Sequence, residues 1–159
     1  MTRTHARSPI GDRVADEVPR NRGQVLTVLG AMRADGETAL GTIDAATSGD
    51  VFIAYMQQIV VPMLRPGDFV VMDNLGAHKA RRVRDLIEAA GARIHWLPPY
   101  SPETNPIELF WAWMKARLRS VGARTREALD RGIAEAAAAL LPAMAASWVR
   151  HCGYRGPRT

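Results

Sequence analysis

The stretch FVVMDNLGAH at residues 69–78 decides the fold, because it joins a short apolar run to an acidic residue. The apolar residues 69–72 predict a strand that is buried on both faces. Asp73 follows at the end of this strand, where an ionised carboxylate is costly unless a cation meets it. Divalent ions such as Mg²⁺ prefer oxygen ligands. The stretch therefore predicts a metal-binding acid at the carboxyl end of a buried strand.

The residues that follow predict a helix and a second strand beside the first. An apolar face from Val83 to Ala90 indicates a helix that Gly91 ends, and residues 92–97 indicate the next strand. A right-handed crossover makes the two strands parallel. Sites on such sheets form at the carboxyl ends of the strands.

A third helix brings a second acid to the same end. Asn105 is placed to act as N-cap and Pro106 as first helical residue, so Glu108 falls in the first turn. Residues 74–107 separate the two acids, and this segment is long enough for the helix, strand and loop that the pattern predicts.

The rest of the chain completes an α/β domain. Residues 25–43 indicate an antiparallel hairpin that turns at Asp35 and Gly36. Ser48 is placed to cap a helix, whose apolar positions at helical spacing are Phe52, Met56, Ile59, Val60 and Met63. Residues 127–141 indicate an Ala-rich helix, and Pro142 begins another. We expect a mixed sheet flanked by helices.

The domain organisation is simple. Residues 1–22 are charged and aperiodic, which predicts a polar arm or loop. We expect residues 23–154 to form one folded core and residues 155–159 to form a tail. No apolar run reaches the roughly 18 residues of a membrane span, and the start lacks the apolar core of a signal peptide. We therefore expect a soluble, cytoplasmic protein.

The charge favours a polyanionic partner. The 159 residues include 21 Lys and Arg against 16 Asp and Glu, which gives a net charge of +5 and a pI near 10.1. Cys152 is alone, so an intramolecular disulfide is excluded and a reducing compartment fits.

Both acids also have structural explanations. Asp73 followed by Asn74 is common turn chemistry after a strand. Glu108, at the third helical position, is placed to fold back and cap its own helix. Local spacing alone leaves both explanations open.

A family resemblance favours the metal-site interpretation. The residues from Asp73-Asn74 to His78-Lys79, the run LPPYSP at 97–102, and NPIE at 105–108 before a Trp- and Lys-containing helix resemble the catalytic core of DDE transposases. The closer resemblance is to bacterial insertion-sequence transposases related to the mariner superfamily. It implies a ribonuclease H-like fold, a magnesium or manganese requirement, and DNA strand cleavage and joining at transposon ends. Asp73 would be the second acid of the family and Glu108 the third.

The first acid of that family does not have a counterpart in the pattern. It belongs on a strand before the hairpin, and neither Asp12 nor Asp16-Glu17 follows an apolar run. We therefore expect an N-terminally truncated or split transposase that lacks its first strand and has little strand-transfer activity alone. We also expect it to associate with itself or with an N-terminal fragment in trans.

Other residues would support the site. Lys115 and Arg119 share a helix flank with Glu108, and they either hold DNA phosphates or form a solvated surface. The resemblance and the positions of Asn74, His78, Lys79 and Asn105 make these four candidates for second-layer metal-site or DNA contacts.

Two rival functions stay open. One is a catalytically inactive, DNA-binding or regulatory remnant of a transposase. The other is a ribonuclease H-like nuclease with a different substrate. In either case the chain would associate with the nucleoid through DNA.

Overall fold

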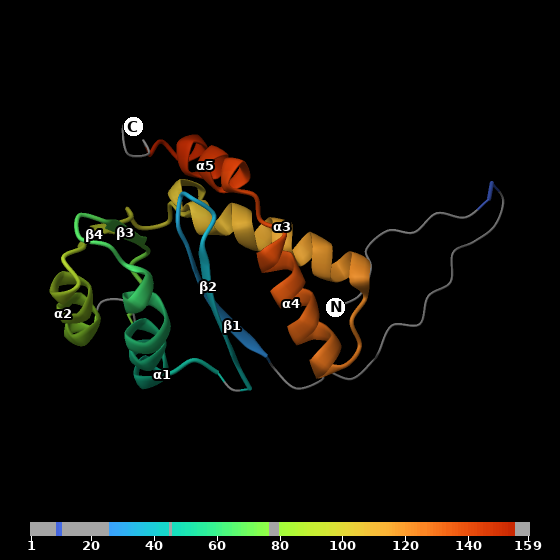
Figure 1. The fold of residues 1–159 in the computed structure, drawn as a ribbon, viewed down its shortest axis with the longest axis horizontal. Coiled ribbons are helices and arrows are strands. Elements are labelled where there is room, and N and C mark those ends of the chain that lie inside the picture. Colours follow the sequence, from blue (N-terminus) through green and yellow to red (C-terminus); the bar gives the residue numbers. More distant parts are fainter. Residues whose placement is uncertain (1–8, 11–25, 45, 77–79, 155–159) are drawn as a thin grey trace.

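The computed structural model describes residues 9–10, 26–44, 46–76 and 80–154 of the chain. Its strands are β1 (Thr27–Met32), β2 (Thr38–Ile43), β3 (Phe69–Met72) and β4 (Arg93–Trp96). Its α-helices are α1 (Gly49–Tyr55), α2 (Arg81–Ala89), α3 (Pro106–Val121), α4 (Arg126–Ala138) and α5 (Pro142–His151). The helical turns η1 (Met56–Val60) and η2 (Val61–Met63) continue α1, and η3 (Pro102–Thr104) precedes α3. The predicted α/β class is confirmed (Figure 1).

The β1–β2 hairpin forms the middle layer of the molecule. It turns where predicted, and Gly36 has a φ of 90° that suits glycine. Because successive side chains of a strand point to opposite faces, Leu29 packs against one apolar core and Val28 against another. In Figure 1 α1 lies on one side of the hairpin and α4 on the other.

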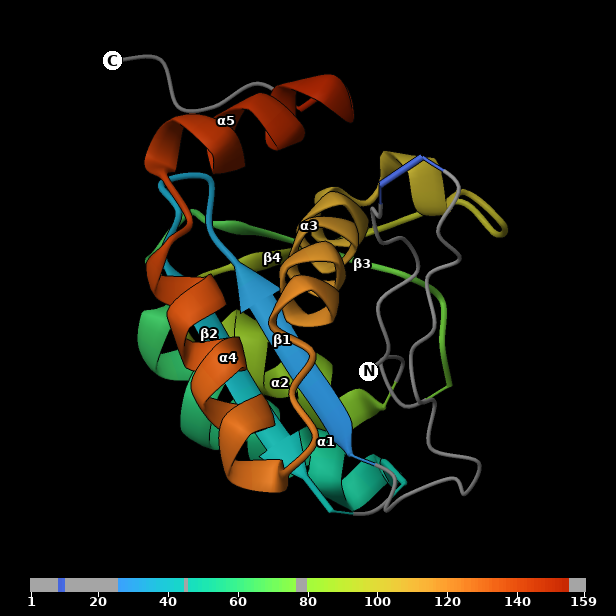
Figure 2. The same cartoon turned by 90° about the vertical axis from the view of Figure 1, so that its right-hand side faces the viewer.

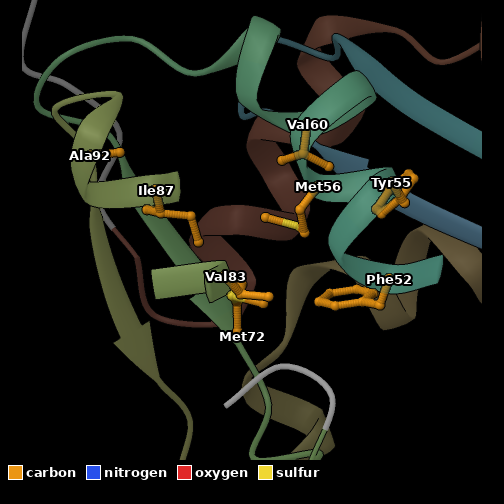
Figure 3. Close-up of a cluster of buried hydrophobic side chains, with 8 residues drawn as sticks. All are labelled: Phe52, Tyr55, Met56, Val60, Met72, Val83, Ile87 and Ala92. Carbon is orange, nitrogen blue, oxygen red and sulfur yellow. The ribbon is translucent and has the colours of Figure 1, made fainter. Parts of the chain in front are cut away.

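The first core, here called the α2 core, lies between α1, α2 and the β3–β4 pair. Val83 and Ile87 of α2 are fully buried and point toward the helical segment 49–60 (Figure 3). Its buried members are Phe52, Tyr55, Met56, Val60, Met72, Val83, Ile87 and Ala92. The predicted apolar face of α2 is confirmed, as is Gly91 with a positive φ just beyond the helix.

The helix capped by Ser48 differs in detail from the prediction. Ser48 does cap it, since its hydroxyl accepts a hydrogen bond from the Val51 N–H at 3.3 Å. The predicted face was wrong at Ile59, which is exposed, and it omitted Tyr55, which is buried. At Ile59 the reason is η1, a π-helical turn, which accommodates more residues per turn and so rotates the apolar face away from a 3.6-residue period. Tyr55 precedes this turn and lies three residues after Phe52, at ordinary helical spacing.

The β3–β4 pair is parallel, as predicted, with Phe69 opposite Arg93 and Met72 opposite Trp96. The prediction of a strand buried on both faces was wrong, because Phe69 is 66% exposed and burial is complete only at Met72. The predicted single mixed sheet also differs: the described strands form two separate pairs, β1–β2 and β3–β4. Within the described residues, each pair lacks the shared neighbour that would merge them.

The second core, here called the α3 core, lies between the hairpin and the last three helices. Its buried members are Phe110, Met114, Leu118, Ile133, Ala136, Leu140 and Ala145. Trp111 packs on this core against Gly30 of β1, and Trp113 stacks at 6.0 Å on Trp148 of α5.

Among the described helices, none is by itself long and apolar enough to cross a membrane. The pair α4 and α5 meets the length and composition test only when taken together, across a bend of 81°. Both of these helices contribute buried residues to the α3 core.

Candidate active site

Asp73 directly follows β3, at the carboxyl end of the parallel pair. Its side chain is half-buried, and its Oδ1 accepts a hydrogen bond from the Leu75 N–H at 3.2 Å. This bond is the local turn arrangement that Asp commonly forms after a strand. The turn explanation of Asp73 therefore applies, and it fixes the direction of the carboxylate rather than competing with a role at a metal.

Asn74 ties the ends of the two parallel strands together. Its side-chain amide donates a hydrogen bond to the Leu97 carbonyl, while the Leu97 N–H donates to the Met72 carbonyl at 2.9 Å. Leu97 is buried, so both bonds are shielded from water. Asn74 thus positions the residue beside it, Asp73, against the start of the β4–α3 connection.

Glu108 lies at the other end of that connection, in the first turn of α3. Asn105 precedes the helix in an extended conformation, as predicted for an N-cap, and Pro106 is the first helical residue. The Asn105 side chain makes no capping bond, so that part of the prediction was wrong. Instead, the Asn105 carbonyl accepts the Glu108 N–H at 3.1 Å.

The capping explanation for Glu108 is not realised. A Glu at this position would cap by accepting the N–H of Asn105. That N–H donates instead to the Pro102 carbonyl at 3.0 Å, inside η3. Glu108 is exposed, so its carboxylate is accessible to a ligand.

The basic flank of α3 is present as predicted. Glu108, Lys115 and Arg119 are all exposed, whereas Phe110 and Met114 on the opposite side are fully or almost fully buried. A track of positive charge therefore runs along α3 away from Glu108. Arg81, Arg82 and Arg84 add exposed cations at the start of α2. His78 and Lys79 lie outside the described residues.

The topology brings the two acids to one end of the molecule. Parallel strands end on the same side, and the chain that leaves β4 at Leu97 reaches α3 within a few residues. Figure 2 shows the chain after β3 and the β4–α3 connection on the same side. Figure 1 shows α3 beginning on the side of β3 and β4 and running away from them.

The donors suit a divalent metal in kind but not in number. Carboxylate oxygens are the ligands that hard divalent ions prefer. Within the described part of the chain, however, there is no group of three or more His, Cys, Asp or Glu side chains that could hold a metal ion. Asp73 and Glu108 alone would supply fewer ligands than such a group.

Sequence reasoning missed how firmly the β4–α3 connection is held. The segment after α5 contacts the connection once and β4 once: Cys152 Sγ lies 3.4 Å from the Glu103 carbonyl, and the Tyr154 ring meets the ring of His95 in β4 edge-on at 5.8 Å. Burial raises the pKa of both the Cys152 thiol and the Tyr154 phenol. Contacts between segments so far apart leave no local pattern in the sequence.

It also missed Tyr100, which lies in the middle of the connection. Tyr100 is fully exposed and has a φ of 59°, in the left-handed region. The signal available in the sequence was an aromatic residue directly after Pro98-Pro99, a position typical of a turn.

Helices that flank a parallel strand pair, with an acid directly after β3 and a second acid in the first turn of α3, match the ribonuclease H-like type of α/β domain. The family described as DDE superfamily endonuclease matches residues 1–130, so the chain belongs to this family. The family assignment confirms the DDE resemblance, so the chain is a transposase-type endonuclease domain, from a family whose substrate is DNA. No curated protein matches the chain. The family match includes residues 1–22, which sequence analysis had left outside the core.

Proposed function

We propose that this chain is the catalytic-domain portion of a transposase of the mariner-related insertion-sequence group. It would cleave and join DNA strands at transposon ends, with Asp73 and Glu108 as ligands of Mg²⁺ or Mn²⁺. The topology carries the proposal: Asp73 directly follows β3, and Glu108 opens α3 at the end of the short connection that leaves the neighbouring parallel strand β4. The unused capping role of Glu108 supports it, because the fold does not need a carboxylate there.

The chain's own residues would divide the work as follows. Asn74 holds the turn that presents Asp73, through its bond to the Leu97 carbonyl. Lys115 and Arg119 would hold backbone phosphates of the DNA strand, since cations along a groove bind that backbone without reading its sequence. A bound divalent metal would supply an activated water or hydroxyl and stabilise the leaving oxygen.

A third carboxylate must come from a segment other than the described residues. The two separate strand pairs support its placement on a strand that joins the hairpin to β3. That strand would come from a preceding segment of a longer or split enzyme, or from a fragment in trans. The active complex would then be an oligomer on DNA.

The first prediction tests the two ligands. We expect Asp73→Asn and Glu108→Gln each to weaken Mn²⁺ binding by about tenfold or more, because each variant removes a side chain that would bind the metal directly. Loss of a residue that only supports a metal ligand already lowers metal affinity by about 10–100-fold. Mn²⁺ binding is measured by electron paramagnetic resonance of the full chain. Asp85→Asn and Glu135→Gln, two exposed acids on α2 and α4, are the matched controls. Unchanged binding in both site variants would remove Asp73 and Glu108 from the proposal.

The same preparation tests completeness. We expect the 159-residue chain alone to give little strand transfer and the addition of a fragment with an acid-bearing strand to restore metal-dependent cleavage. Robust magnesium-dependent nicking by the chain alone would contradict the proposal that its active site is incomplete.

A second candidate function is a DNA-binding regulator without catalytic activity. The observation that favours it is the lack of a three-acid group within the described residues. It predicts DNA binding that no fragment converts into cleavage.

A further inference from the structure

Tyr100 occupies a position that its residue type does not suit. Among the described residues it is the one non-glycine residue with a positive φ, at 59°. A left-handed conformation is strained for a side chain with a Cβ, and glycine or asparagine adopts it at lower cost. The Tyr100 ring gains nothing from burial in return, because it is 100% exposed. Folding therefore does not account for a tyrosine here.

The backbone around Tyr100 is held firmly. Pro99 precedes it in a turn, a position where the fixed φ of proline favours the turn. On the other side, Thr104 Oγ1 donates to the Ser101 carbonyl at 2.7 Å, and the Ser101 hydroxyl donates to the Pro99 carbonyl at 3.4 Å. These bonds restrict the backbone that carries the ring, so the ring loses little conformational entropy when it binds a partner.

Its location joins the ring to the proposed site. The connection that carries Tyr100 starts at Leu97, which is bonded to Asn74, and ends at Asn105, three residues before Glu108. The exposed cations Lys115 and Arg119 follow on the same helix as Glu108. An exposed aromatic ring near a basic track is the combination by which proteins bind single-stranded nucleic acid.

We propose that Tyr100 stacks on an unpaired nucleobase next to the DNA phosphate held at the site. The inference rests on the proposed function and specifies its substrate: DNA with unpaired bases beside the point of cleavage. A base within a duplex already stacks on its neighbours, so a protein ring can cover it only when it is unpaired. Stacking of this kind tolerates any base, since every base has a π-face.

The test compares two DNA probes that bind the full chain without divalent metal. One is a blunt duplex, and the other is the same duplex with an unpaired overhang that carries a fluorescent adenine analogue. Affinity is measured by anisotropy, stacking by quenching of the analogue, and stability by thermal unfolding. The variants are Tyr100→Asn, which suits a positive φ but has no ring, and Tyr100→Trp, which keeps a stacking face. Leu141→Asn, at an exposed apolar residue before α5, is the control.

We expect Tyr100→Asn to bind the overhang probe about tenfold or more weakly, in line with the usual effect of one base–aromatic contact. Quenching of the adenine analogue should disappear in this variant. Its affinity for the blunt duplex should stay the same, and its thermal midpoint should not fall. Tyr100→Trp should keep overhang binding and quenching. The control should match the unmodified chain in affinity and quenching on both probes, while its thermal midpoint should rise, because asparagine is a better N-cap for α5 than leucine.

The other outcomes separate the two proposals. Equal affinity of the unmodified chain and Tyr100→Asn for the overhang would overturn the stacking contact and leave the nuclease proposal standing. An equal loss of affinity for both probes would make Tyr100 a general DNA contact. A changed sedimentation coefficient of Tyr100→Asn without a change in DNA binding would make it a protein contact. Either result overturns the inference. If the unmodified chain binds neither probe, the proposed function itself fails.

Discussion

The α2 core and the α3 core differ in what they present to the candidate site. The α2 core supports β3, which carries Asp73 at its end, whereas the α3 core fixes the helix that carries Glu108. The hairpin lies between them and contributes one face to each. The relative position of the two acids is therefore set by packing across the hairpin, in addition to the short β4–α3 connection.

The two cores also differ in how they pack. The α2 core has one aromatic pair, Phe52 and Tyr55 at 6.1 Å, among aliphatic and methionine side chains. It also includes a π-helical turn, an element often found at functional sites. The α3 core has a chain of aromatic contacts, with Phe110 at 5.3 Å from Trp111 and 6.1 Å from Trp113. Aromatic pairs have preferred geometries, whereas methionine adapts to irregular space. We infer that α3 is the more rigid of the two supports.

The largest expected effect comes from removing one buried side chain on each side of the hairpin. Phe110→Ala in the α3 core should lower the free energy of unfolding by about 3–5 kcal/mol, and Ile87→Ala in the α2 core by about 2–5 kcal/mol. Both side chains are fully buried, so each variant leaves a cavity. Urea unfolding followed by circular dichroism measures the change.

The same experiment tests whether the cores unfold together. Trp96 packs on the α2 core, whereas Trp111, Trp113 and Trp148 pack on the α3 core. A variant that keeps Trp96 alone therefore reports on the first side, and Trp96→Phe reports on the second. A shared hairpin predicts coincident transitions for both probes. Two separate transitions would show that the supports of the two acids are independent.

Residues with strong local signals were predicted correctly. The helix that begins at Pro106, the cap by Ser48 and the end of α2 before Gly91 all depend on neighbours within a few positions. The parallel β3–β4 pair was also predicted correctly, because two strands joined by a helix prefer a right-handed crossover that makes them parallel. These elements were enough to place Asp73 directly after β3 and Glu108 in the first turn of α3.

The remaining features depend on contacts between distant segments. The exposure of Phe69 follows from which strands meet, and hydrophobicity does not report that. The π-helical turn changes the face of residues 56–60 without a distinctive residue type. Tyr100 departs from the residue type that its backbone favours, which is expected where function outweighs local preference.

Glycine substitutions on the two faces of the hairpin test the same comparison with a smaller effect. A Cβ on Gly30 would lie 2.7 Å from the Trp111 ring, whereas one on Gly41 would lie 3.2 Å from the Tyr55 ring. Gly30→Ala should therefore destabilise the protein by about 1–3 kcal/mol, and Gly41→Ala by less. Thermal unfolding and tryptophan emission check the order. A larger loss for Gly41→Ala would contradict the closer packing on the α3 side.

The smallest expected effect on stability comes from an ion pair on the α2 side of the hairpin. Arg33, at the end of β1, forms a two-bond ion pair with Asp68, just before β3, at 2.5 and 3.2 Å. Arg33 also donates to the Met63 carbonyl at 3.0 Å. The hydrogen bond from Arg33 lowers the pKa of Asp68 below its ordinary value of 3.8. The hairpin is thus joined to the Asp73 side through a charge that depends on pH.

Asp68→Asn should lower the free energy of unfolding by about 1–2 kcal/mol at neutral pH. This is the usual contribution of a hydrogen bond to a charged group, reduced because the pair is partly exposed to solvent. Because the native pKa is lowered, the contribution is fully present above 3.8 and is lost as the pH falls through the native value. Urea unfolding of both proteins at neutral and at acidic pH should therefore give a difference that shrinks in acid. Glu135→Gln, at an exposed acid of α4, is the control. A difference that stays constant down to strongly acidic pH would mean that the pair contributes through shape alone, and the hairpin would then be held on its α2 side by packing, as it is on its α3 side.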